Sequence, residues 1–258
     1  MQRLKILILG GTTEASALAR LVAGDPRFDP VLSLAGRTKA PQTPPIAYRV
    51  GGFGGVAGLA RHLREEDIDA LVDATHPFAA QISAHAVAAA RETEVPLLAI
   101  CRPAWQVGPG DRWTNVPDIA AAASALGTAP RRVFLTIGQK DLAPFRGAPQ
   151  HYYVIRSVDA PDPAAVPPQA EIIAARGPFV EVDERRLLAE KRIDVVVTKN
   201  SGGAATEAKL AAARSLGIPV ILVDRRPPLD VPTVTTAAEA LLWLEQRHRA
   251  TVRSERGV

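Results

Sequence analysis

Short apolar runs rich in branched residues alternate along the chain with longer Ala- and Leu-rich stretches, in which apolar positions recur with a helical period. Strands of parallel sheets are buried on both faces, so they appear in a sequence as continuous apolar runs, and helices connect them. The pattern therefore predicts an α/β protein, built from βαβ units around mainly parallel sheets.

Residues 1–103 are predicted to form a first domain. Its strands are predicted at Lys5–Leu9, Val31–Leu34, Ala70–Asp73 and Pro96–Ile100. Its helices are predicted at Glu14–Val22, Gly55–Glu65 and Ala79–Glu92. The stretch 102–117 is then rich in proline and glycine, which is typical of a linker between domains.

Residues 104–246 are predicted to form a second α/β domain, followed by a charged, frayed tail at residues 247–258. Its strands are predicted at Val133–Thr136, Tyr152–Ile155, Val195–Val197 and Val220–Val223, and its helices at Asp118–Leu126, Val182–Glu190 and Ala204–Ser215. The similarity of Ile68–Val72 to Ile193–Val197 indicates two related domains, although any two βαβ units share this plan. Parallel sheets bind ligands at the carboxyl ends of their strands, so we expect a functional cleft between the domains.

Composition narrows the class of protein. With 258 residues and 47% hydrophobic side chains, the chain can bury a full core. A net charge of +4 without a long basic block, and only 5% aromatic residues, argue against nucleic-acid binding. The apolar run Ile6–Leu9 is far too short for a signal peptide, and no run approaches a membrane span. The single cysteine, Cys101, suits a reducing compartment, so we expect a cytoplasmic protein without membrane contact.

The first predicted strand runs directly into Gly10, Gly11, Thr12, Thr13 and Glu14, which open a helix. Glycines let a phosphate approach the backbone, and a helix start supplies free N–H groups. The spacing differs from G-x-G-x-x-G, so the turn predicts a ligand loop in general, and a purely structural turn stays open.

The end of the second strand favours NADPH as the cofactor. NAD-binding folds usually place a carboxylate there for the ribose, whereas this chain has Gly36, Arg37, Thr38 and Lys39. Arg37 and Lys39 offer the charge-assisted donors that a 2′-phosphate needs. The alternative is that both charges are merely solvated.

Two later segments of the first half have the character of binding loops. The glycine cluster around Phe53 suits close contact with a ligand, as does the turn that follows the strand ending at Asp73. The residues predicted to bind are Gly52, Phe53, Gly54, Ala74, Thr75, Pro77 and Phe78. His76 in the same turn is a candidate proton donor or orienting group, and a structural role for it is equally open.

Two turns of the second half also follow strands and combine small polar residues, glycine and a lysine. This composition is typical of an anion-binding turn at a helix start. The residues predicted to bind are Thr136, Gly138, Asn200, Ser201, Gly202 and Gly203, with Lys140 and Lys199 facing the cleft.

Taken together, Gly10–Ala15, Asp73–Ala79, Thr136–Gly138, Thr198–Gly203 with Lys209, and Arg226-Pro227 resemble the precorrin-6A reductase family. The resemblance implies two Rossmann-like domains and reduction of one double bond of precorrin-6A by NADPH, giving precorrin-6B in cobalamin biosynthesis. The tetrapyrrole carries many carboxylates, for which Lys140, Arg176 and Lys199 are candidate partners. The family's sister branch reduces the cobalt-containing substrate, and we favour the metal-free one. No metal site is expected, and neighbouring pathway enzymes are candidate transient partners.

Other functions compete with this interpretation. A short-chain dehydrogenase needs Tyr and Lys four apart, a spacing that this chain lacks. A nucleotide-sugar transferase could share the domains and the Gly-Gly-Thr turn, but it offers no reason for Arg37 and Lys39. A two-lobed protein that binds a small anion without chemistry is the non-enzymatic alternative.

Overall fold

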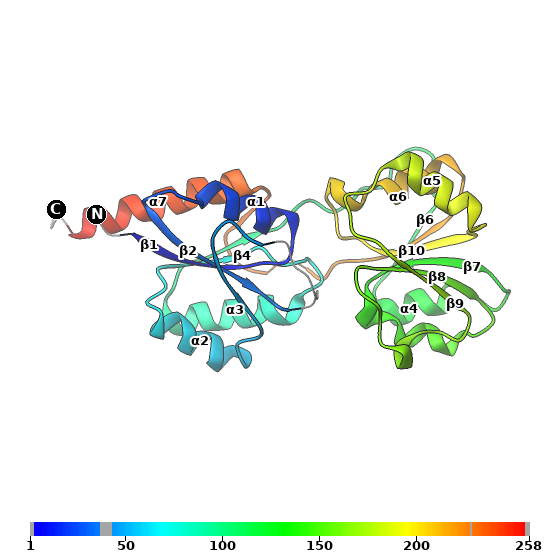
Figure 1. Cartoon of the computed structure of the whole chain (residues 1–258), viewed down its shortest axis with the longest axis horizontal. Helices are drawn as coiled ribbons and strands as arrows, with labels where there is room; N and C mark the ends of the chain where they lie inside the picture. The colour runs from blue at the N-terminus through cyan, green and yellow to red at the C-terminus, as the bar shows by residue number, and fades with distance from the viewer. Residues whose placement is uncertain (1–2, 37–42, 228, 256–258) are drawn as a thin grey trace. The chain divides into compact units, whose positions relative to one another are not determined.

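The computed structural model describes residues 3–36, 43–227 and 229–255, with the side chains of 253–255 excluded. Within these residues the strands form two six-stranded sheets, in which every pair of neighbouring strands is parallel. The chain divides into two compact units, residues 1–103 with 226–258 (unit 1) and residues 104–225 (unit 2). Figure 1 shows each unit as one sheet between two layers of helices.

The sheet of unit 1 has the order β12-β5-β4-β1-β2-β3. Its strands are β1 (Leu4–Leu9), β2 (Phe28–Leu34), β3 (Ala47–Val50), β4 (Ala70–Asp73), β5 (Leu97–Ile100) and β12 (Thr233–Val234). The first five strands follow the order of the dinucleotide-binding fold, in which the chain builds outward from a central first strand in both directions.

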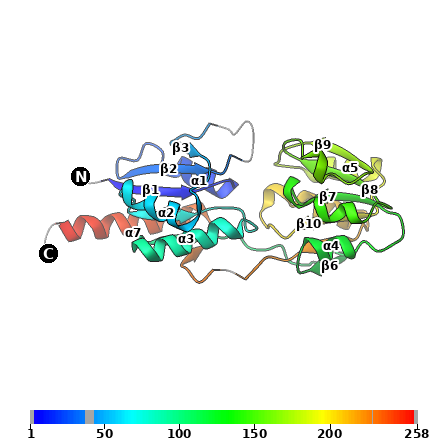
Figure 2. The ribbon, with the colours of Figure 1, turned by 90° about the horizontal axis from the view of Figure 1, so that it is seen from below.

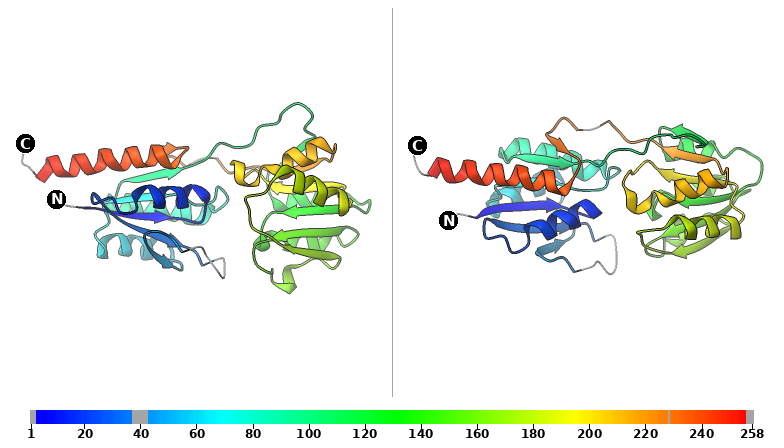
Figure 3. Two further views of the ribbon diagram at one scale, coloured as in Figure 1. Left: turned by 45° about the horizontal axis from the view of Figure 1, so that its top comes forward. Right: turned by 90° about the horizontal axis from the view of Figure 1, so that it is seen from above.

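Alternation along β1 divides the core of unit 1 into two layers. Ile6 and Ile8 pack with α1 (Thr13–Val22) and α7 (Ala237–Glu255), whereas Leu7 and Leu9 pack with α2 (Gly55–Glu65) and α3 (Ala80–Thr93). Figure 2 shows α2 and α3 across one face of this sheet, and Figure 3 shows α7 running beside α1 on the other. Since both faces are covered, the inner strands are largely apolar, and their polar residues lie mostly near the strand ends.

The sheet of unit 2 has the order β6-β11-β10-β7-β8-β9, which repeats the plan of unit 1. Its strands are β6 (Trp113–Val116), β7 (Arg132–Thr136), β8 (Tyr152–Ser157), β9 (Ala170–Ala174), β10 (Val195–Lys199) and β11 (Val220–Val223). Its helices are α4 (Ile119–Ser124), α5 (Glu181–Glu190) and α6 (Ala208–Ser215), with short 3-10 turns η1 (Gln139–Asp141), η2 (Ala143–Gly147), η3 (Pro163–Ala165) and η4 (Ala204–Thr206). Phe134, Val154 and Val196 pack against Leu188 of α5 and Leu210 of α6.

The structure corrects the predicted course of the C-terminal residues. The prediction placed residues 104–246 in one domain, whereas the chain returns to unit 1 at Arg226. Here β12 pairs with β5, and Ala237, Ala240 and Leu244 of α7 are buried in the unit 1 core. The predicted frayed tail is also wrong for residues 247–255, because α7 continues to Glu255, and residues 256–258 lie outside the described residues. The predicted linker, in turn, contains β6, which completes the edge of unit 2.

Candidate functional site

The carboxyl ends of β1 and β4 lie next to each other in the sheet of unit 1. From β1 the chain continues to β2 on one side, and from β4 to β5 on the other. Such a reversal of strand order is where open α/β sheets bind ligands. The turns that follow β1 and β4 therefore form the candidate site of this unit.

The turn after β1 depends on its two glycines. A Cβ atom on Gly10 would lie 2.7 Å from the Cδ1 atom of Leu32, which is buried in the core. Gly11 has φ +119°, a conformation that residues with side chains rarely adopt. The turn leads into the first turn of α1, where backbone N–H groups lack partners within the helix and attract anions.

Thr12 ties the two turns together. Its Oγ1 donates a hydrogen bond of 2.7 Å to the carbonyl oxygen of Ala74 and accepts one of 3.1 Å from the backbone N–H of Ala15. The hydroxyl thus caps α1 and holds the turn after β4 against the turn after β1. Glu14 is placed in an ion pair with Arg102 at 2.9 Å, and both side chains are largely buried.

The turn after β4 is ordered by its own polar side chains. Asp73 Oδ1 accepts a hydrogen bond from the backbone N–H of Thr75 at 3.0 Å, and the Thr75 hydroxyl lies 3.2 Å from that of Ser83. His76 Nδ1 accepts a bond of 3.2 Å from the N–H of Phe78. A neutral His76 ring therefore carries its proton on Nε2. Pro77, like Phe78, is half-buried in this turn.

The carboxyl ends of β2 and β3 carry an arginine that the sequence analysis did not single out. Arg49 Nη1 donates to Ser33 Oγ at 2.9 Å and to the carbonyl oxygen of Gly51 at 3.0 Å. Its Nη2 donates to the carbonyl oxygen of Gly52 at 3.1 Å, and its guanidinium carbon lies 4.0 Å from the centroid of the Phe53 ring. The predicted glycine cluster is thus organised around Arg49.

Two further glycines lie in the loops at the carboxyl ends of β2 and β3. Gly36, after β2, has φ +68°, and Gly54, before α2, has φ +83°. Phe53 also contacts His62 of α2, with ring centroids 5.2 Å apart. Burial, reinforced by the nearby charge of Arg49, lowers the pKa of His62. The predicted phosphate partners Arg37 and Lys39, and Thr38, which is also predicted to bind the cofactor, lie outside the described residues.

In unit 2 the equivalent reversal lies between β7 and β10. Thr136 Oγ1 donates a long hydrogen bond of 3.4 Å to the carbonyl oxygen of Val197, across these two strands. Gly138, with φ +87°, begins the turn η1, which presents the exposed side chain of Lys140. Lys199, at the end of β10, pairs with Asp141 of the same turn.

Asn200 has a clear structural role in unit 2. Its Oδ1 accepts a bond of 2.8 Å from the N–H of Trp105, and its Nδ2 donates one of 3.2 Å to the carbonyl oxygen of the same residue. The Trp105 indole N–H in turn donates to the carbonyl oxygen of Gly203 at 3.3 Å. Ser201 and Gly202 are buried in the same turn. The predicted binding residues of this segment are thus brought together, but the Asn200 amide is engaged by the backbone of Trp105.

A buried ion pair lies beneath the loop that follows β9. Arg156 of β8 pairs with Glu184 of α5 at 2.5 Å, with side chains only 7% and 4% exposed. The Arg156 guanidinium carbon lies 3.7 Å from the centroid of the Phe179 ring and so supports this loop. Arg176, the third predicted substrate partner, is exposed in the same loop.

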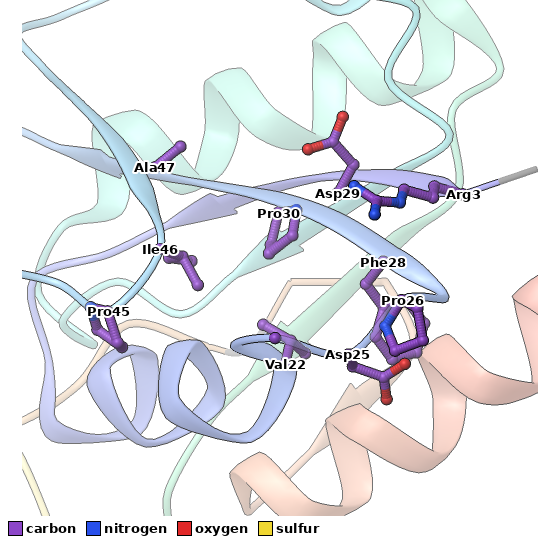
Figure 4. Close-up of a pocket in the computed structure, with 11 residues that line it drawn as sticks. Arg3, Val22, Asp25, Pro26, Phe28, Asp29, Pro30, Pro45, Ile46 and Ala47 are labelled. Carbon is purple, nitrogen blue, oxygen red and sulfur yellow. The ribbon is translucent and has the colours of Figure 1, made fainter.

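The structure also shows a hollow away from the carboxyl ends of the strands. A hollow lined by Arg3, Asp29 and Pro45, among others, lies at the amino end of β2, the sheet edge opposite the candidate site (Figure 4). Among the described residues, no group of His, Cys, Asp and Glu is placed to hold a metal ion. No helix in the described part of the chain is long and apolar enough to cross a membrane.

Comparison with known proteins identifies the relatives of this chain. Residues 5–245 match the model of the family "Precorrin-6x reductase CbiJ/CobK". The precorrin-6A reductase of Sinorhizobium sp is 56% identical over 93% of this chain and 92% of its own length. That of Rhodobacter capsulatus is 52% identical, with 96% and 98% covered.

The solved structure of the CobK precorrin-6A reductase superposes with a TM-score of 0.89 at 51% identity, covering 94% of this chain and 96% of that one. The cobalt-precorrin-6A reductase of Priestia megaterium is more distant, at 30% identity over 92% of this chain and 96% of its own length.

Proposed function

Because the chain belongs to the CbiJ/CobK precorrin-6x reductase family, we propose that it reduces one double bond of precorrin-6A with NADPH, giving precorrin-6B in cobalamin biosynthesis. The assignment of the substrate rests on the 56% identity, over nearly the whole length of both chains, to a relative named precorrin-6A reductase. The 30% identity to a relative named for the cobalt-containing substrate favours the metal-free one.

Unit 1 is suited to hold the cofactor. Its strand order, the turn Gly10–Thr12 and the start of α1 together fit a dinucleotide, whose pyrophosphate would bind at the helix start. When bound, the nicotinamide supplies the hydride, so the protein's own residues need mainly to bind, orient and exclude water. Gly10 and Gly11 would let the pyrophosphate approach the backbone, and Thr12 would fix the turn.

The choice of NADPH rests on the end of β2, where Ser33-Leu34-Ala35-Gly36 offers no carboxylate for a ribose hydroxyl. Arg37 and Lys39 would supply charge-assisted hydrogen bonds to the 2′-phosphate.

Unit 2 would bind carboxylates of the macrocycle. Lys140 and Arg176 are exposed cations on loops at the carboxyl ends of its strands, where ligands of α/β sheets bind. Lys199 would contribute from the end of β10, with Asp141 positioning its ammonium group.

In unit 1, His76 would hold a proton at Nε2, the ring nitrogen that does not accept the hydrogen bond from Phe78.

Anaerobic incubation of the purified protein with precorrin-6A and NADPH tests this function. We expect the absorption spectrum of the macrocycle to change with loss of one double bond, and one NADP⁺ to form for each substrate consumed. Parallel reactions with NADH and with cobalt-precorrin-6A show which cofactor and which form of the substrate the protein prefers. A macrocycle left unchanged by NADPH would refute the proposal, and faster reduction of the cobalt form would move the chain to the sister branch.

A further inference from the structure

We propose that Arg49, together with the hydroxyl of Ser33, binds the 2′-phosphate of NADPH and so helps to set the cofactor preference. This inference rests on the proposed function, because it assigns a further residue to the same cofactor. It adds a specificity-determining residue on β3, a strand outside the segment that carries Arg37 and Lys39.

The position of Arg49 in the sheet supports this assignment. Arg49 is the direct neighbour of Ser33 in the pairing of β3 with β2, one residue before each strand ends. In dinucleotide-binding sheets, the carboxyl end of the second strand lies beside the adenosine ribose. A cation on the adjacent strand that already reaches Ser33 therefore lies where a 2′-phosphate is expected.

The guanidinium group is held in place before any ligand binds. Three of its N–H groups donate to Ser33 Oγ and to the carbonyl oxygens of Gly51 and Gly52, and Phe53 packs against its plane. An arginine has five N–H donors, and within the described part of the chain the structure shows no partner for the other two of Arg49. A preformed pair of donors suits two oxygens of one phosphate.

The charge of Arg49 is not neutralised within the described residues, where no carboxylate pairs with it. Arg156 of unit 2, near the carboxyl end of β8, gives a comparison within the same chain. That arginine is paired with buried Glu184 and packed against Phe179, so it cannot serve an incoming anion. Burial and, to a smaller extent, the charge of Arg49 lower the pKa of nearby His62, against the opposing effect of Glu65 and Glu66.

Ser33 completes the recognition of a phosphate. Its Oγ accepts the hydrogen bond from Arg49, so its own proton can be donated to a phosphate oxygen. A ribose hydroxyl, by contrast, is usually recognised by a carboxylate that accepts its proton, and neither Arg49 nor Ser33 supplies one. The pair therefore discriminates between the two cofactors by charge.

The test compares the affinities for NADPH and NADH in Arg49→Met, which keeps an unbranched chain but loses the charge, and in Arg49→Lys. The matched control is Arg61→Met on α2, whose side chain is 69% exposed. We expect Arg49→Met to lose about ten- to a hundredfold in NADPH affinity, with NADH affinity within about twofold, because only charge-assisted bonds to the 2′-phosphate are lost. The NADPH affinity of Arg49→Lys should lie between those of Arg49→Met and the wild type, since lysine keeps the charge but lacks the paired donors of a guanidinium group. The NADPH affinity of Arg61→Met should match that of the wild type.

Adenosine 2′,5′-bisphosphate and AMP are used as competing probes in the same assays. A purely structural role for Arg49, as support of the glycine loop, would lower the affinities for both probes and both cofactors in parallel, and would overturn the inference. An unchanged NADPH preference in Arg49→Met would also overturn it. If Arg49→Met does not fold, the ratio of NADPH affinity to NADH affinity in Arg49→Lys decides between the two roles. The proposed function fails separately, if the wild type neither binds NADPH nor reduces precorrin-6A.

Discussion

Replacing Thr12 with valine should separate the two candidate ligand turns of unit 1 while keeping the shape of the side chain. The hydroxyl makes two hydrogen bonds, one that caps α1 through Ala15 and one to the carbonyl oxygen of Ala74. Loss of an N-cap costs about 1 kcal/mol, and loss of a bond to a buried carbonyl costs about 1–3 kcal/mol. Because Thr12 is half-buried and water can reach part of the site, we expect the lower end of the sum, about 2 kcal/mol.

Thermal unfolding and cofactor titration of the full chain check this expectation. A loss of about 2 kcal/mol corresponds to a Tm lower by about 4–8 °C for a protein of this size. NADPH affinity should fall as well, because the turn after β4 is no longer held against the turn after β1. Thr12→Ser, which keeps the hydroxyl, is the control and should stay within about 0.5 kcal/mol of the wild type. A valine variant with wild-type Tm and wild-type affinity would refute the role assigned to Thr12.

Three further changes probe the cofactor site, the substrate site and the core of unit 2. The double variant Arg37→Ala/Lys39→Ala should lose about ten- to a hundredfold in NADPH affinity while NADH affinity stays level, and equal losses for the two cofactors in fluorescence titration would contradict this. Lys199→Ala should raise the KM for precorrin-6A severalfold without unfolding the protein, because it removes a cation at a strand end, and steady-state kinetics with a wild-type KM would exclude that role. Glu184→Gln should destabilise the protein by about 3 kcal/mol, since it leaves Arg156 buried without its charge partner. Urea unfolding measures this cost, and a change below about 1 kcal/mol would show that the pair is dispensable.

The inner strands of both sheets could be predicted from the sequence, and the edge strands could not. Each of the eight predicted strands corresponds to an inner strand, because strands buried on both faces contain a continuous run of apolar residues. The four strands that were missed, β3, β6, β9 and β12, are the edges of the two sheets. The edge strand β3 is largely exposed, so no continuous apolar run marks it.

The return of the chain to unit 1 was missed for a different reason. Ala237, Ala240, Leu241 and Leu244 have the spacing of an amphipathic helix, a signal that was present in the sequence. The spacing reveals the helix but not the sheet against which it packs. That assignment depends on β12 pairing with β5, a contact between residues far apart in the chain.

The positions of two of the predicted binding turns agree with the βαβ pattern of the sequence. The turns after β1 and β4 lie together as their place in the βαβ pattern indicates, joined by Thr12 and Ala74. Arg49 was missed because the role that we propose for it depends on the pairing of β3 with β2. Asn200 was interpreted as a ligand residue, yet its amide holds the backbone of Trp105, a contact that no local pattern announces.

Transfer of deuterium from the cofactor is the measurement that tests the proposed reaction most directly. Purified protein is incubated anaerobically with precorrin-6A and NADPH that carries deuterium on one or the other face of C4, and the macrocycle is analysed by mass spectrometry. Direct hydride transfer predicts a reduced macrocycle that retains one deuterium from one of the two labelled forms and none from the other. A macrocycle that is not reduced, or a reduced product without deuterium from either form, would contradict the assignment.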